Sequence, residues 1–253
     1  MTGGGPVHGT WEAEPAARWE DAFLSGNGRH GALAFGDPDD ERVVVTHHTL
    51  VRPVPAAETL PPRLADRLAG LQDRLLAGDA AAAEGFTDGR PLRWVGAFHP
   101  AFAVRFRREG AGVAGGAGAG AAAGYRRAVD FATGVVRAGC RGHGSRVFVS
   151  RADDVIVQYV TGAPVTAGIA LDHRLPGAPD ALAVGRGTVL VPEGALLTLR
   201  ARYPEDDGLG FTGVTLALAG GGAETAVEGE GLRVTGAREV LLLTRVRRHP
   251  GEL

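Results

Sequence analysis

The sequence contains many short segments in which apolar and polar residues alternate, separated by glycine, proline and aspartate. Phe102, Val104 and Phe106 alternate with Ala103 and two arginines, the period of two that gives a β-strand one buried face. Further strand-like segments are 30–35, 41–46, 125–131, 145–151, 153–161, 165–172, 188–191, 195–202, 211–219 and 239–245. Many strands at short spacing indicate a mainly β fold, a sandwich or a barrel, rather than alternating β–α–β units.

One segment follows the helical period instead. Its leucines recur three or four residues apart, after a proline pair and before Gly78, which is the usual order of helix start and stop signals. These leucines are Leu64, Leu68, Leu71 and Leu75. A shorter helical stretch is expected over 79–84, with Asp79 as its cap. We therefore predict a helical insertion over residues 61–86, with its leucine stripe packed on the β-sheet core.

A run of glycine and alanine over residues 110–124 has too few large side chains to offset the entropy cost of ordering it. We expect a flexible loop between two strands there. It lies inside the β-rich region, so we expect residues 1–253 to form a single domain with one helical insertion.

Composition excludes several classes of protein. A formal net charge of -2 provides no basic field for nucleic acid. No apolar run approaches the ~18 residues of a membrane helix, and the N-terminus lacks the pattern of a signal peptide. The lone Cys140 excludes an internal disulfide framework. We expect a cytoplasmic protein that binds neither nucleic acid nor membrane.

The Gly-rich segment 26–31 is the most distinctive candidate site. Its glycines expose backbone N–H groups and Arg29 adds a positive charge, as in loops that hold anions. A strand follows it, however, whereas a nucleotide-binding fingerprint needs a helix there. Two interpretations remain. One is a tight turn with Asn27 in a left-handed conformation; the other is a polar loop, with Asn27, Arg29 and His30, that points at a sugar or a neighbouring domain.

Histidines alone do not predict a metal site. His47 and His48 are adjacent, and adjacent strand residues face opposite sides of a sheet, so they are poor co-ligands. His30 and His99 lie elsewhere in the sequence. We expect neither a metal nor another cofactor.

The chain offers no evident catalytic centre. Inverting glycoside hydrolysis, for example, needs two carboxyl groups about 6.5–9.5 Å apart. The acidic pairs are 39–40, 153–154 and 206–207, all in contexts typical of turns or strand edges, where solvated acids are usual. No serine lies in a nucleophile elbow, and Cys140 has no evident base. We predict no catalytic residues in this chain.

Two tryptophans have polar neighbours that suit a sugar-binding surface. Trp19 and Trp94 are candidates for stacking on a sugar ring, with burial in a core or an interface as the alternative.

Two blocks of sequence resemble the N-terminal domain of glycoside hydrolase family 95, the α-L-fucosidase-like enzymes. The first runs from Trp19 to Gly36 and continues over 41–50. The second is 125–134, with the segment 146–157 after it. The chain departs from the family pattern at His47 and His48, where that pattern has Asn-Glu, and at Val51, where it has tryptophan.

This resemblance implies a large antiparallel β-sandwich, a super-sandwich, that precedes a linker and a catalytic (α/α)6 barrel. In that family the barrel carries the general acid and the carboxamide-assisted water activation of an inverting glycosidase. The chain ends at Leu253, before any barrel. We therefore expect either the N-terminal part of a longer enzyme or the product of a gene that has lost its catalytic half.

The resemblance also implies partners and site residues. The partners would be a barrel domain, in cis or in trans, and an oligosaccharide. The residues expected at the substrate or the domain interface are Trp19, Asn27, Arg29, His30, His47, His48 and Trp94. Two alternatives remain: a free-standing carbohydrate-binding module, in which Trp19 or Trp94 stacks on sugar, and a structural remnant that pairs with a separately encoded barrel.

Overall fold

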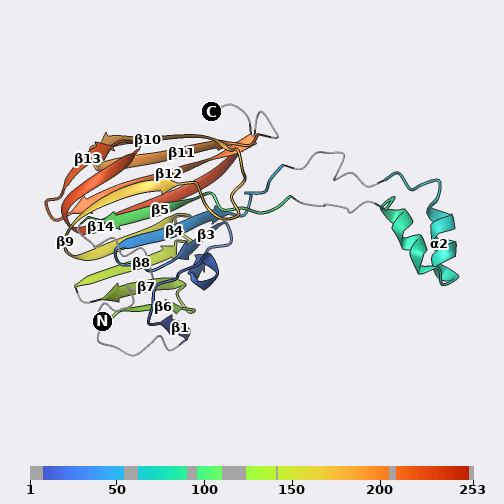
Figure 1. Ribbon diagram of the computed structural model, residues 1–253, viewed down its shortest axis with the longest axis horizontal. Coiled ribbons are helices and arrows are strands. Elements are labelled where there is room, and N and C mark those ends of the chain that lie inside the picture. Colours follow the sequence, from blue (N-terminus) through green and yellow to red (C-terminus); the bar gives the residue numbers. More distant parts are fainter. Residues whose placement is uncertain are drawn as a thin grey trace. The chain divides into compact units, whose positions relative to one another are not determined.

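The computed structural model describes residues 8–53, 62–89, 96–109, 124–140, 142–204 and 209–250. Contacts divide the chain into two compact units, one formed by Met1–Leu50 with His99–Leu253 and the other by Val51–Phe98. The predicted mainly β fold is confirmed in the larger unit (Figure 1). Its strands are β1 (Gly9–Glu12), β2 (Phe23–Gly26), β3 (His30–Ala34), β4 (Asp40–His47), β5 (Phe102–Arg108), β6 (Arg126–Asp130), β7 (Val135–Cys140), β8 (His143–Val149), β9 (Ile156–Asp172), β10 (Ala183–Val191), β11 (Gly194–Arg202), β12 (Leu209–Gly220), β13 (Glu224–Glu228) and β14 (Gly231–Pro250). A short 3-10 helix, η1 (Trp19–Asp21), precedes β2.

Two long strands, β9 and β14, belong to both layers of the sandwich. The first part of β9, up to Gly162, pairs with β8, and its second part, from Ala167, pairs with β5. Strand β14 pairs with β9 along both of these parts. The first layer therefore has the order β1-β6-β7-β8-β9-β14-β12-β11-β10, and the second layer the order β2-β3-β4-β5-β9-β14-β13. All of these pairings are antiparallel, as the sequence predicts for a sandwich.

Glycine permits the change of layer. The pairing of β14 with β9 shifts register between Val234 and Glu239, where Gly236 has φ +74°. In β9, Gly162 has φ +148°, and a Cβ atom on it would overlap the carbonyl oxygen of Gly142. Other residues rarely adopt such backbone angles. The two strands bend at the points where their glycines lie.

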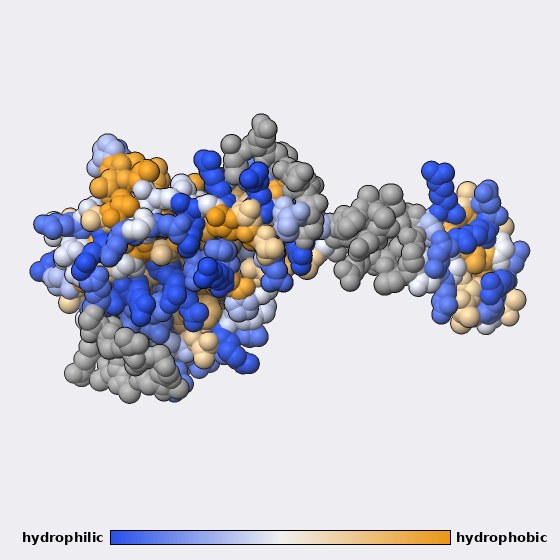
Figure 2. Space-filling view, turned by 45° about the horizontal axis from the view of Figure 1, so that its top comes forward, coloured by the Kyte–Doolittle hydropathy of each residue, from blue (hydrophilic) through white to orange (hydrophobic). Residues whose placement is uncertain are grey.

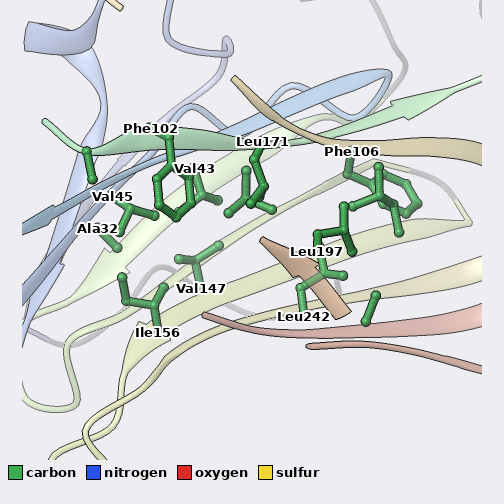
Figure 3. Close-up of a cluster of buried hydrophobic side chains, with 14 of the residues drawn as sticks. Ala32, Val43, Val45, Phe102, Phe106, Val147, Ile156, Leu171, Leu197 and Leu242 are labelled. Atoms are coloured by element: carbon green, nitrogen blue, oxygen red, sulfur yellow. The ribbon is translucent and has the colours of Figure 1, made fainter. Parts of the chain in front are cut away.

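The core fills the space between the layers. Figure 3 shows Val43, Phe102 and Phe106 of the second layer facing Ile156 and Leu242 of the first. All five side chains are almost completely buried. The alternation seen in the sequence is thus the alternation between this core and the outer faces of the layers.

The alternating pattern predicted most of the strands, but several strand bounds differ in the structure. Strands 153–161 and 165–172 were expected separately and are one strand, β9, because its bend keeps the pairing with β14. Four strands were not predicted. These are β1, β2, β7 and β13, which are short or rich in small residues.

The smaller unit contains the predicted helical insertion as α2 (Leu68–Leu76) and the 3-10 helix η2 (Ala80–Phe86). Leu64 lies before α2. The Asp79 carboxylate accepts the Ala81 N–H at 3.1 Å, so its capping role is confirmed. Leu71 is buried, and a Cβ atom on Gly85 would contact its side chain at 2.5 Å. The described contact of the leucine stripe is therefore with η2, and its packing on the sandwich stays a prediction.

The glycine and alanine run lies almost wholly outside the described residues, which resume at Gly124. In the described part of the chain, no helix has the length and apolar composition that crossing a bilayer requires.

We predict that Gly162→Ala destabilises the protein by roughly 2–4 kcal/mol, because the new methyl group meets backbone at a strained φ. Gly168→Ala, in the same strand, has nothing within 4 Å of the added Cβ and serves as the control. Urea unfolding followed by circular dichroism measures both. Equal unfolding free energies for the two variants would contradict a special role for Gly162.

Candidate functional site at one end of the sandwich

The Gly-rich segment forms the tight turn between β2 and β3. Asn27 donates its backbone N–H to the His30 carbonyl oxygen at 3.2 Å, and its side-chain oxygen accepts the N–H groups of Arg29 (2.9 Å) and His30 (2.8 Å). The residue with positive φ is Gly28, at +91°, so the expectation of a left-handed Asn27 is wrong. Asn27 stabilises the turn through its side chain instead.

The Asn27 amide also joins this turn to the turn between β8 and β9. It donates to the Ser150 carbonyl oxygen at 3.0 Å and to the Asp154 carboxylate at 2.9 Å. His30 Nδ1 lies 3.1 Å from the same carboxylate, and the Arg245 and Arg29 guanidinium groups lie 3.2 and 3.6 Å from it. We call these five residues, Asn27, Arg29, His30, Asp154 and Arg245, the Asp154 network.

The network keeps Asp154 ionised. The hydrogen bond from Asn27, followed by that from His30, holds the pKa of the Asp154 carboxyl well below its usual range. The expectation of a solvated turn acid is therefore wrong for Asp154. A carboxylate with this many partners does not donate a proton near neutral pH, so Asp154 has a positioning role rather than that of a general acid.

His30 fastens the turn to β14. Its side chain is 1% exposed, and its Nε2 lies 3.1 Å from the carbonyl oxygen and 3.2 Å from the backbone nitrogen of Val246. Its Nδ1 faces Asp154, so this nitrogen carries the proton and donates it to the carboxylate. One side chain thereby connects three segments that are far apart in the sequence.

His47 and His48 lie beside the network and close to each other. The ring centroids of His30 and His47 are 4.7 Å apart, and those of His47 and His48 are 4.5 Å apart. Adjacent residues within a strand face opposite sides of a sheet, but β4 ends at His47, so this rule does not apply to His48. Burial, followed by the charges of His30 and His48, lowers the pKa of His47 to about 4, which leaves its ring neutral at pH 7.

Of the remaining sequence candidates, those that the structure describes lie apart from this cluster. His99 is buried and bonds the Tyr203 hydroxyl through Nε2 at 2.7 Å. Trp19 is 55% exposed in η1, and in the described residues no hydrogen bond or ring contact joins it to the network. Trp94 and the acidic pair 206–207 lie outside the described residues. Within the described ranges, no group of three or more metal-ligating side chains comes together.

Two arginines of the network present their side chains to solvent. Arg29 is 68% exposed and Arg245 is 61% exposed, whereas Asn27 and His30 are held inside by their hydrogen bonds. Hydrogen bonds therefore hold the inner side of the turn, and two arginines make its outer surface cationic. This arrangement suits contact with another polar surface better than chemistry on a substrate.

Glu41 is a titratable group that sequence reasoning missed. Burial raises the pKa of its carboxyl to about 7, although the Gly36 N–H (2.9 Å) and the Ser145 hydroxyl (3.2 Å) donate to it. The cavity beside it holds about 20 Å³, room for one water and not for a sugar. The sequence did contain an indication that Glu41 is buried, because it lies two residues before Val43 and therefore on the inward face of β4.

The second sequence block, 125–134, packs against the first, Trp19–Gly36. The Tyr125 hydroxyl donates to the Gly36 carbonyl oxygen at 2.7 Å. The buried Arg127 side chain donates to the carbonyl oxygens of Glu14 and Asp21, both at 2.7 Å, and its guanidinium lies over the Phe23 ring. The two sequence blocks are thus one packed unit, in which the second fixes the chain that enters and leaves the first.

Comparison with known families adds one finding. A family model described as the N-terminal domain of glycosyl hydrolase family 65 matches residues 10–249. No curated protein matches the sequence.

We expect Asn27→Ala to lower the unfolding free energy by about 1–3 kcal/mol, because it removes four hydrogen bonds and leaves Asp154 short of a donor. Arg29→Ala removes an exposed side chain from the same turn and should change stability by less than ~0.5 kcal/mol. Urea unfolding at pH 7 compares them. A similar loss in both variants would mean that the amide does not hold the turn.

The raised pKa of Glu41 predicts a specific pH dependence of the unfolding free energy. Its pKa is raised on folding, so the folded state binds the proton more tightly, and stability falls as pH rises from about 4.5 to about 7. Between pH 5 and pH 8 the loss due to Glu41 should be about 2–3 kcal/mol. Glu41→Gln should abolish this loss, while the exposed Asp39→Asn should follow the wild type. Parallel pH profiles for Glu41→Gln and wild type would show that Glu41 titrates normally.

Proposed function

Because this chain belongs to the family of glycosyl hydrolase family 65 N-terminal domains, we propose that it is the non-catalytic N-terminal β-sandwich of a glycosidase of the α-L-fucosidase type. In this role it supports a catalytic (α/α)6 barrel, in cis or in trans, and contributes the β2–β3 turn to the domain interface or the substrate site. The match over residues 10–249 is the observation that carries the proposal. The α-L-fucosidase type rests on the resemblance of the two sequence blocks to family 95.

The carboxylates of the candidate site support a non-catalytic role. Asp154 is held ionised by the network, and Glu41 lies beside a cavity too small for a sugar. Inverting hydrolysis needs an acid and a base on either side of the bond. Neither carboxylate is placed to act on a sugar, so the proposal assigns the chemistry to the barrel.

The turn has the properties that an interface element needs. Asn27, His30 and Asp154 fix its backbone from below, so presenting Arg29 to a partner costs little ordering entropy. His47 and His48 stand in place of the Asn-Glu of the family 95 pattern, and the ring of His47 is neutral. A neutral ring beside an exposed guanidinium suits hydroxyl and carboxylate partners.

The test mixes the purified chain with a catalytic barrel, expressed from the same reading frame or from the neighbouring gene. The purified chain alone should not hydrolyse an aryl α-L-fucoside, and the barrel should bind it. Arg29→Glu should weaken binding at least tenfold. Arg238→Glu makes the same change at an exposed position of β14, eight residues before Val246, which His30 contacts, and should leave binding unchanged.

Other outcomes of this experiment are also informative. Turnover by the chain alone would overturn the non-catalytic role, and equal binding by both variants would remove the turn from the interface. The exposed Trp19 favours the alternative of a free-standing carbohydrate-binding module. Calorimetric heat with fucosylated or galactosylated oligosaccharides, lost in Trp19→Ala, would support that alternative instead.

A further inference from the structure

A row of apolar side chains crosses six strands on the outer face of the first layer. Residues that pair directly in an antiparallel sheet point to the same face. Following the register from β10 to β8, the row is Val189, Leu196, Leu216, Leu243, Val157 and Phe148. Their neighbours Leu197 and Leu242 point into the core, so the row points away from it.

This row is wide and partly exposed. Leu218, Leu241 and Tyr159 form a second row beside it. Val189 is 56% exposed, and the other members of the first row each keep part of their surface accessible. Figure 2 shows one apolar area at the upper left of the main body and a separate one nearer its centre. A row of partly exposed apolar side chains across six strands of an outer face is a candidate interaction surface.

Arginines border the apolar rows. Arg200 and Arg247 lie on either side of Thr212, two rows from the Leu216 row, and Arg245, paired with Asp154, lies in the row between. On the opposite side of the Leu216 row, Arg146 pairs with Tyr159 at the end of the second row. Arg200, Arg247 and Arg146 are exposed, and in the described residues none of them has an ion pair. The carboxylate of the next row, Glu239, accepts the Tyr159 hydroxyl. Among the described residues, these three arginines therefore remain available to a partner's carboxylates.

The dimensions fit a helix. Six strands span five gaps of about 4.8 Å, or about 24 Å. A helix of about 16 residues has this length. Rows two residues apart are separated by about 7 Å, so Arg200 and Arg247 lie about 14 Å from the Leu216 row and Arg146 about 7 Å from it. A glutamate on the flank of the helix and an extended arginine together span the larger distance.

We propose that this face binds an amphipathic helix of a partner polypeptide, with its apolar stripe on the Leu216 row and carboxylates on both flanks paired with Arg200, Arg247 and Arg146. Charge selects this occupant, because a second copy of the chain would bring arginine rows against arginine rows. The inference goes beyond the proposed function, since it concerns a sheet face and not the β2–β3 turn.

The test uses two synthetic helical peptides of 18 residues and the full chain. Both peptides carry leucine at positions i, i+3, i+4 and i+7, and they differ only in having glutamate or lysine on the flanks. Fluorescence anisotropy should show the glutamate peptide binding at least tenfold more tightly. Arg247→Glu should reduce this preference at least fivefold, whereas Arg107→Glu, the same change at another exposed arginine, on β5 of the second layer, should not.

A variant in the apolar row completes the test. Leu216→Ser should weaken binding of the glutamate peptide, with its circular dichroism spectrum showing that the fold is kept. If that variant does not fold, the Arg247→Glu result alone decides. Equal affinity for the two peptides, or binding of neither, overturns the proposal. So does self-association in sedimentation that Leu216→Ser abolishes, or binding to phosphatidylserine vesicles without binding to the glutamate peptide.

Discussion

The bend in the paired strands β9 and β14 is the constraint on which the rest of the structure depends. At Gly162 and Gly236 the two strands pass from one layer to the other while staying largely paired. Backbone hydrogen bonding thus continues between the layers, and the apolar sides of both halves face one core. A side chain at Gly162 would collide with the neighbouring backbone, so the bend requires glycine at that point.

The bend also determines what meets at the end of the sandwich. Because β9 starts in the first layer and β3 lies in the second, the turn before β9 comes to rest against the turn before β3. Asp154 and Asn27 meet there, with His30 reaching β14 beneath them. Buried polar groups are tolerated at this junction because each has a partner. The result is a rigid turn with Arg29 exposed on it.

Local rules predicted the parts of the molecule that depend on local pattern. Alternation at Phe102, Val104 and Phe106 gave a correct strand and a correct core face, and Asp79 was recognised as a cap. The rule of opposite faces failed for His48, because the strand ends one residue earlier. Asp154 looked like a solvated turn acid, since its partners Asn27 and Arg245 lie about a hundred residues away in either direction.

The sequence by itself determined a mainly β sandwich with a helical insertion, the tight Gly-rich turn and the resemblance to a glycosidase N-terminal domain. All of these are properties of residue periods, turn chemistry or linear motifs. Only the tertiary structure decided that Asp154 is held ionised, that Glu41 is buried with a raised pKa, and that Leu216 and Leu243 share an outer apolar row. The physical reason is that electrostatic environment and strand register depend on residues distant in sequence, which folding alone brings together.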